Sequence, residues 1–504
     1  DVDGGTIKLD GNYPVGTGNV ALGDDALRDG SLSGGNNTAM GHYALYANTS
    51  GAENTSVGRA NLDANTTGSH NTALGSTALS SNTTGQFNTA LGTFALKENT
   101  TASRNTAVGY QAGLANTTGY NNLFAGVSAG DSNTTGALNA LSGSFSGATN
   151  TTGSFNTAYG AESLYSNTTA GSNTAVGYQA GYTNTTGATL DAFGALALYT
   201  NTTGSNNAAF SAEALKLNTT GGSNSAFGRA TMFNNTTGSN NVGVGAFALQ
   251  ANTTASENVA VGYQAGYSTT TGGANTSVGV KALYLNTTAV ANTALGWNAA
   301  YSNTTGASNV AIGYQSLASN TTASNNTAVG YQAGYSFTTG GYSTVMGYQA
   351  AQNATAGGTV AIGHSSAKNN TGAGITAVGS NALVTNTSGT SSTGIGTNAL
   401  NDNTTGGYNV ALGRNALYSN TTANNNTAVG YAALNLNTTG TQNVALGQSA
   451  ATNTTTGGQN TAVGTNALNF NTTASNNTAV GYQAGYSTTT GGENSYFGRF
   501  SGKG

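Results

Sequence analysis

The residues most able to carry chemistry stand in a repeated Asn-Thr-Thr triplet. Asn-x-Thr is the acceptor sequence for N-glycosylation, which needs an exposed Asn, and the triplet occurs in segments typical of exposed turns. The alternative is a stacked Asn ladder, in which side-chain amides pair from one copy of the repeat to the next and the Thr residues satisfy the turn backbone. We favour the ladder, because such triplets arise freely in turns rich in Asn and Thr. Thr269, Phe337 and Thr488 replace the Asn in some copies, so no single position is indispensable. The candidate acceptors are Asn65, Asn82, Asn99, Asn116, Asn133, Asn150, Asn167, Asn184, Asn201, Asn218 and Asn235.

Tyr-Gln pairs form a second candidate binding feature. Tyr178, Tyr263 and Tyr482 each precede a Gln, and an exposed strip of such side chains could contact sugars. The alternative is that identical side chains stack in columns along a repetitive fold. We favour stacking, because it follows from the repeat itself.

One segment of the repeat contains a serine and matches a catalytic motif. Residues 126–130 read GVSAG, which matches the G-x-S-x-G of a nucleophile elbow. The same slots read GYQAG in other copies, and no Asp and His are placed to complete a triad, so we predict that the protein is not an enzyme.

The few histidines and acidic residues suggest no metal site and no cofactor. His42, His70 and His364 are scattered over variable slots and are predicted to be solvated surface residues. Calcium-binding repeats need an Asp in every turn, and the chain has 16 Asp and Glu residues altogether, which excludes that class.

The overall composition is far from that of an ordinary globular domain. Charged residues make up 6% of the 504 residues, and there are 76 glycines, one proline and no cysteine. The net charge of −4 offers no basic surface for nucleic acid. No apolar run approaches the roughly 20 residues of a membrane-spanning helix, so we expect no membrane insertion. The chain starts at Asp1 without a signal peptide, so we expect a processed or excised portion of a longer product.

A 17-residue repeat organises the chain. An opening Asn recurs at Asn37, Asn54, Asn71 and onward, and a Gly four residues later keeps the same interval, with Ser211 as the exception. A constant period of this length indicates a solenoid, and 37% hydrophobic residues at fixed intervals argue against disorder. We therefore predict an all-β fold, a parallel β-solenoid of about 29 coils, which at about 4.8 Å per coil would form a rod of roughly 140 Å.

Each coil is predicted to contain two short strands and a turn. The first strand is 174–176 in one copy, and the second is 178–180 with the residue after it. Ala175 and Val176 should point to opposite faces, and both slots are mostly apolar, so both faces should be buried. A single coil has only one interior. We therefore predict that neighbouring chains cover the second face.

The repeat sets the predicted domain boundaries. Residues 1–18 are predicted to be an N-terminal cap or joining segment, and residues 19–504 one continuous solenoid. The interval falls to 16 residues twice, between Ser343, Thr359 and Ile375. A bend or ligand site could lie there, but we favour a change of length in a tolerant surface turn.

The repeat resembles a known family. The unit N-[TSV]-A-[VIL]-G-x-x-A resembles the head repeat of YadA-like trimeric autotransporter adhesins, and the opening DGGTIKLDGNYPVGTGNVALG is more similar to bacteriophage tail-fibre proteins. The resemblance covers the chain from about Asn19 to its end and implies a left-handed parallel β-roll with three chains side by side. The units here are longer, with the NTTG turn as the extra part. No coiled-coil stalk or C-terminal β-barrel anchor is present, so we expect a head fragment, a phage fibre shaft or a free fibril.

These observations predict a structural fibre for adhesion or host attachment, located outside the cell, on its surface or on a virion. Its partners would be copies of itself, as a homotrimer, and a cell-surface glycan or receptor. One alternative is an extracellular fibril subunit that polymerises end to end, with N-glycans on the Asn-Thr-Thr turns. Another is a carbohydrate-binding module, which would lose glycan binding when the tyrosines are replaced by Ala.

Overall fold

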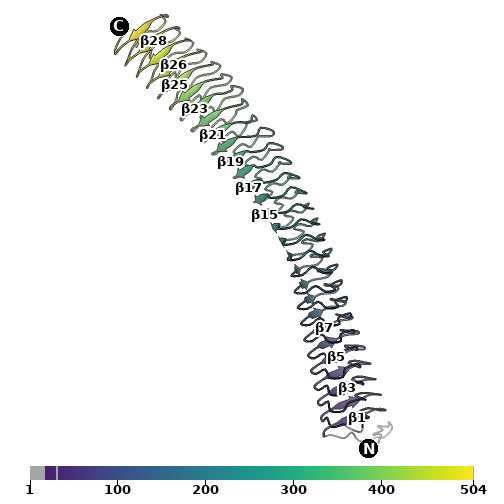
Figure 1. The fold of residues 1–504 in the computed structure, drawn as a ribbon. Coiled ribbons are helices and arrows are strands. Elements are labelled where there is room, and N and C mark those ends of the chain that lie inside the picture. The colour runs from purple at the N-terminus through teal and green to yellow at the C-terminus, as the bar shows by residue number, and fades with distance from the viewer. Residues whose placement is uncertain (1–16, 30–31, 503–504) are drawn as a thin grey trace, which may run out of the picture. The chain divides into compact units, whose positions relative to one another are not determined.

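Two compact units, each a parallel β-solenoid, make up the fold. The computed structural model describes residues 17–29 and 32–502, and the units are Asp1–Ala255 and Ser256–Gly504. In each unit, strands of three residues lie one above another (Figure 1). The predicted all-β solenoid is confirmed, and the described residues contain no helix that could cross a membrane. Of the predicted cap or joining segment 1–18, only residues 17 and 18 lie within the described part.

The strands of the first unit recur once per coil. They are β1 (Val20–Leu22), β2 (Thr38–Met40), β3 (Thr55–Val57), β4 (Thr72–Leu74), β5 (Thr89–Leu91), β6 (Thr106–Val108), β7 (Leu123–Ala125), β8 (Ala140–Ser142), β9 (Thr157–Tyr159), β10 (Thr174–Val176), β11 (Asp191–Phe193), β12 (Ala208–Phe210), β13 (Ser225–Phe227) and β14 (Val242–Val244).

The second unit repeats the same arrangement. Its strands are β15 (Val259–Val261), β16 (Thr276–Val278), β17 (Thr293–Leu295), β18 (Val310–Ile312), β19 (Thr327–Val329), β20 (Thr344–Met346), β21 (Val360–Ile362), β22 (Thr376–Val378), β23 (Thr393–Ile395), β24 (Val410–Leu412), β25 (Thr427–Val429), β26 (Val444–Leu446), β27 (Thr461–Val463), β28 (Thr478–Val480) and β29 (Ser495–Phe497).

Neighbouring strands pair in parallel and in register, so equivalent residues of successive coils form columns. Ala175 of β10, for example, lies between Ala158 and Ala192. The register also holds where the interval is 16 residues, since β20 pairs with β21 and β21 with β22 at equivalent positions. The missing residue is therefore lost from the turn, as predicted.

The strand places its middle residue in the core and its outer two residues on the surface. Ala175 is fully buried, whereas Thr174 and Val176 are partly exposed. This confirms the predicted opposite orientation of Ala175 and Val176, because side chains alternate along a strand. The core is thin: Ala175 and Ala180 face it in this coil, and a buried Leu such as Leu79 joins them in most others.

The predicted second strand is wrong, because residues 178–180 form a turn. Gln179 and Gly181 have positive φ values of 54° and 62°. A left-handed residue at every second position breaks the alternation of a strand, so adjacent residues such as Ala78 and Leu79 can both be fully buried. The turn still bonds to the neighbouring coil, since the Gln179 N–H donates to the Ala161 carbonyl at 3.0 Å.

Glycine is required at the corner that follows each strand. Gly177 has a φ of 137°, a conformation that costs other residues of order 1–3 kcal/mol. A Cβ there would also lie 2.7 Å from the backbone of Gly194 in the next coil. The Gly column found in the sequence is therefore both a conformational and a packing requirement.

A large core side chain in one coil is accompanied by small residues in the coils beside it. Phe124 replaces the usual buried Ala of the strand, and Gly113 and Gly130 stand where other coils place Leu. A Cβ on either glycine would lie about 2.4–2.5 Å from the Phe124 ring. The Phe124 ring thus fills the space that two Leu side chains would otherwise occupy.

Candidate functional site

The predicted glycosylation acceptors form a buried hydrogen-bonded ladder, which we call the turn Asn column. Asn82 Nδ2 donates to Asn65 Oδ1 at 2.8 Å and to the Gly85 carbonyl at 3.1 Å. Asn99 Nδ2 in turn donates to Asn82 Oδ1 at 2.9 Å. Equivalent bonds join every pair of successive members from Asn48 to Asn252. The predicted ladder is present.

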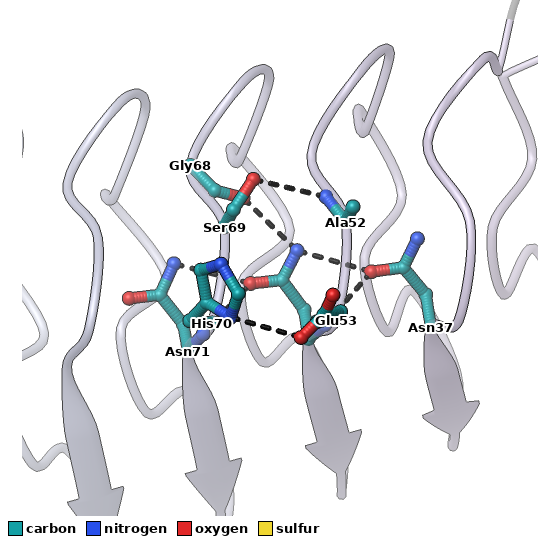
Figure 2. Close-up of polar contacts among 8 residues, drawn as sticks. Asn37, Ala52, Glu53, Gly68, Ser69, His70 and Asn71 are labelled. Atoms are coloured by element: carbon teal, nitrogen blue, oxygen red, sulfur yellow. Dashed lines mark hydrogen bonds and ion pairs between the residues drawn. The ribbon is translucent and has the colours of Figure 1, made fainter.

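The opening Asn of each coil forms a second ladder, the opening Asn column. Asn71 Nδ2 donates to Asn54 Oδ1 at 3.1 Å, and the Asn71 backbone N–H donates to the same oxygen at 2.9 Å. Figure 2 shows this column beside the polar contacts of the neighbouring turn. Asn71 Nδ2 also reaches the Gly85 carbonyl at 2.9 Å, the same oxygen that Asn82 uses. The two columns are therefore joined through one carbonyl in this coil.

Burial of the turn Asn column bears on N-glycosylation. The glycosylation alternative requires exposed asparagines, but Asn65, Asn82, Asn99, Asn116, Asn133, Asn150, Asn167, Asn184, Asn201, Asn218 and Asn235 are all at most 2% exposed. The Nδ2 atom is the one that would carry a sugar. In Asn82 this atom already donates both of its protons, one to Asn65 Oδ1 and one to the Gly85 carbonyl. A glycan on such an Asn would require the coil to open.

The first Thr of each triplet satisfies the turn backbone, as predicted. Thr83 Oγ1 donates to the Thr100 carbonyl at 3.1 Å, and the Thr83 N–H donates to the same oxygen at 2.8 Å. The second Thr, such as Thr84, is exposed. The triplet is thus a structural unit with a buried amide, a bonded hydroxyl and a surface hydroxyl.

The predicted sugar-contacting tyrosines lie on the surface, each in a separate coil. Tyr178 is 54% exposed, Tyr263 46% and Tyr482 44%. Tyr178 belongs to the first unit and the other two to the second. Arg499 lies 5.7 Å from the Tyr482 ring centre, and Phe500 meets that ring edge-on.

The predicted stacking occurs where aromatic residues follow one another in the same column. Trp297, Tyr314, Tyr331, Tyr348 and His364 form a stack, which we call the ring column, with ring centres 4.8–5.2 Å apart. The accompanying glutamines pair as well, since Gln332 Nε2 donates to Gln315 Oε1 at 2.9 Å.

A second set of stacked tyrosines is less exposed. Tyr182 lies between Tyr165 and Tyr199, with ring centres 5.1 and 5.3 Å away. Burial within the stack, followed by the charge of Glu162, raises the pKa of the Tyr182 phenol above its usual value. The phenol is therefore neutral at physiological pH and acts as a packing group.

The serine of the GVSAG segment is placed unlike a catalytic nucleophile. Ser128 is 4% exposed and takes part in the turn that follows β7, with a φ of 51°. Its N–H donates to the Tyr110 carbonyl at 2.9 Å, as equivalent turn residues do in other coils. Ser128 therefore has the backbone conformation and hydrogen bond of an ordinary turn residue of the repeat.

The histidines lie on the surface, and two of them have acidic neighbours that the sequence reasoning missed. His70 Nδ1 is 3.0 Å from Glu53 and its ring stacks on Phe87. His42, Asp24 and Asp25 bring their ligand-type atoms within 4.8 Å of one another. Comparing the same slot in successive coils would have found both groups, because equivalent residues stack.

An apolar column, which we call the outer apolar column, lies on the surface of each unit. It consists of the last residue of each strand, which is Val, Leu, Ile, Met, Phe or Tyr everywhere in the described strands except Ala125 and Ser142. Leu74 is 47% exposed and Leu446 48%. No described member of the column is charged, although it faces outward.

Comparison of the sequence with known proteins does not assign the chain to a family. No protein-family model matches the chain, and no curated protein has a similar sequence. What the arrangement can do therefore rests on its geometry.

Proposed function

We propose that this protein is a non-catalytic structural fibre, in which solenoids associate side by side through the outer apolar column. The observation that carries the proposal is an exposed, charge-free row of large apolar side chains in both units. Contiguous apolar surfaces of this kind are uncommon on soluble monomers and mark interaction sites.

A second copy of the chain is the partner that best fits the column. The column repeats once per coil, at about 4.8 Å, and another copy repeats at the same interval along its whole length. A globular partner would match only a few coils. Three chains side by side is the arrangement implied by the resemblance to YadA-like adhesin heads, and it would cover the outer apolar column of each chain.

Such a fibre acts mechanically, by holding an attachment site at a distance or by bridging surfaces. Stacked coils joined by two amide ladders stiffen each solenoid, and the chain has no cysteine that could form disulfides. We place it outside the cell, on the cell surface or on a virion, where adhesion or host attachment needs such an element.

Single cysteines test the side-by-side arrangement, because the chain contains none of its own. Leu74→Cys in the outer apolar column should oxidise to a covalent dimer on a denaturing gel. Thr84→Cys, which is exposed on the turn of the same coil, should stay monomeric. Sedimentation should give a trimer for the wild-type protein, and a monomer there would overturn the proposal.

Carbohydrate attachment is a second candidate, favoured by the exposure of Tyr178 at 54%. Its neighbours in the same column are Ala161 and Ala195, so no adjacent ring in that column covers its faces. Tyr178→Ala should then abolish binding on a glycan array while leaving the oligomer intact. Unchanged glycan binding in this variant would remove Tyr178 from the site.

A further inference from the structure

The ring column is the longest run of stacked aromatic rings that the structure describes. Its five rings come from five successive coils of the second unit and are within 13° of parallel at each step. Trp297, Tyr314, Tyr331 and Tyr348 are 41–48% exposed. Val280 precedes the run and Ser380 follows it in the same slot, so the column has two defined ends.

Stacking determines which part of each ring a ligand can reach. The faces of Tyr314, Tyr331 and Tyr348 are turned toward neighbouring rings above and below, so their edges face solvent. Sugars that bind by stacking need an open ring face, which these inner rings do not offer. Ring edges carry partial positive charge, and they attract the negative face of another aromatic system in an edge-to-face arrangement.

The glutamines that follow the rings in the chain are ordered. Gln349 Nε2 donates to Gln332 Oε1 at 3.3 Å, and Gln332 Nε2 donates to Gln315 Oε1 at 2.9 Å. The glutamine side chains hold one another, so the surface beside the rings is preorganised.

We propose that the ring column is a binding site for flat, elongated, conjugated molecules, which lie along the solenoid axis with their aromatic face against the ring edges. A ligand that spans two coil spacings, about 10 Å, meets three rings at once. Each ring adds one edge-to-face contact, so affinity depends on an uninterrupted run of rings. This site is separate from side-by-side association, which uses the outer apolar column.

The probe for this site is 2-(4-aminophenyl)benzothiazole, an uncharged flat fluorophore, titrated into the intact protein. We expect saturable fluorescence enhancement, and about tenfold weaker binding for Tyr331→Leu, which removes the central ring. Tyr331→Phe should retain wild-type affinity, because the ring edge is kept. Because Tyr331 is 41% exposed, neither change disturbs the core, and circular dichroism will verify the fold.

Tyr178→Ala is the matched control, because it removes an exposed ring of the same slot that lies outside the ring column. It should leave the affinity unchanged. The proposal is overturned if the wild-type protein does not bind the probe, if Tyr331→Leu binds as well as the wild type, or if Tyr178→Ala weakens binding equally.

Discussion

Two stretches of the molecule, one in each unit, build the same coil with different interiors. In the regular stretch, residues 37–184, Asn fills both ladder columns in every coil. In the interrupted stretch, residues 337–392, other side chains take their places. Phe337 and Ala354 fill the turn Asn column, and Ser343, Thr359, Ile375 and Ser392 fill the opening Asn column.

The interrupted stretch shows that the ladders are not what defines the coil. Parallel pairing continues without a break from β19 to β23. A hydroxyl takes over one hydrogen bond that an Asn side chain accepts in other coils, since Ser343 Oγ accepts the Thr359 N–H at 3.2 Å. The corner glycines and the Ala-rich core are common to both stretches, so these residues specify the fold.

The ladders instead strengthen the attachment of each coil to the next. Where Phe337 ends the turn Asn column, the preceding Asn320 Oδ1 is buried without a hydrogen-bond partner. A buried polar atom left in this state costs about 1–3 kcal/mol. Local opening should therefore be easier in the interrupted stretch, which hydrogen exchange followed by mass spectrometry would detect as faster exchange there.

The largest effect should come from breaking the ladder inside the regular stretch. Asn133→Leu removes the bonds to Asn116 Oδ1 and the Gly136 carbonyl, and Asn150 Nδ2 loses one of its two acceptors. We expect local stability to fall by about 3–5 kcal/mol, because several buried polar groups lose partners together. Native-state hydrogen exchange of the surrounding coils measures this loss.

The control for this variant is Ala354→Leu in the interrupted stretch, where no amide bond is lost. Ala354 is fully buried and occupies a position of the turn Asn column without an amide group. Overpacking there should cost about 1–3 kcal/mol. Equal losses in the two variants would mean that the ladder contributes no more than packing.

A buried Phe occupies space beside a glycine in both places, Phe124 beside Gly113 and Phe337 beside Gly334. This match can be tested in the regular stretch. Phe124→Ala should destabilise its coils by about 3–5 kcal/mol through cavity formation. Gly113→Leu should also destabilise, because a Cβ there already lies 2.5 Å from the Phe124 ring. Combining the two restores the usual Ala and Leu pair, so the double variant should be more stable than either single variant. Additive losses in this double-mutant cycle would disprove the volume match.

The sequence was sufficient to predict the features that follow from period and residue size. The interval between Asn54 and Asn71 predicted the coil, and the Ala175–Val176 pair predicted one buried and one outward side chain. Stacking of identical side chains predicted the turn Asn column, because columns follow from a constant period.

Features that depend on backbone conformation within the coil could not be predicted. The second apolar segment is a turn because Gln179 and Leu79 adopt positive φ values of 54° and 52°, which few non-Gly residues do. Sequence pattern alone favoured a strand there. The link between the two Asn columns depends on the Gly85 carbonyl, and the orientation of a backbone group has no residue-type signal.

The corner glycine, common to both stretches, can be tested at its one exception in the sequence. Ser211 stands in that column with a φ of 132°, a region that costs a non-Gly residue of order 1–3 kcal/mol. Ser211→Gly should therefore stabilise its coil by about 1–2 kcal/mol, visible as slower hydrogen exchange from β12 and β13. The matched variant Gly228→Ser, at a corner with a φ of 131°, should destabilise. A neutral result for both would show that the corner is not strained.

The smallest expected change in stability concerns a buried carboxyl oxygen of the regular stretch that has no hydrogen-bond partner. Asp63 Oδ1 is buried without a hydrogen-bond partner. Burial raises the pKa of the Asp63 carboxyl above its usual value and outweighs the backbone N–H groups of Asp63 and Ala64, which lower it. Because the folded state holds the proton more tightly than the unfolded state, this carboxyl opposes folding at neutral pH and does so less as pH falls through its folded pKa. Asp63→Asn should slow exchange in its coil about twofold at pH 7, and the gain should shrink toward pH 4. A gain that grows on acidification would mean that the charged form is the favoured one, and that the regular stretch contains no electrostatic penalty at this site.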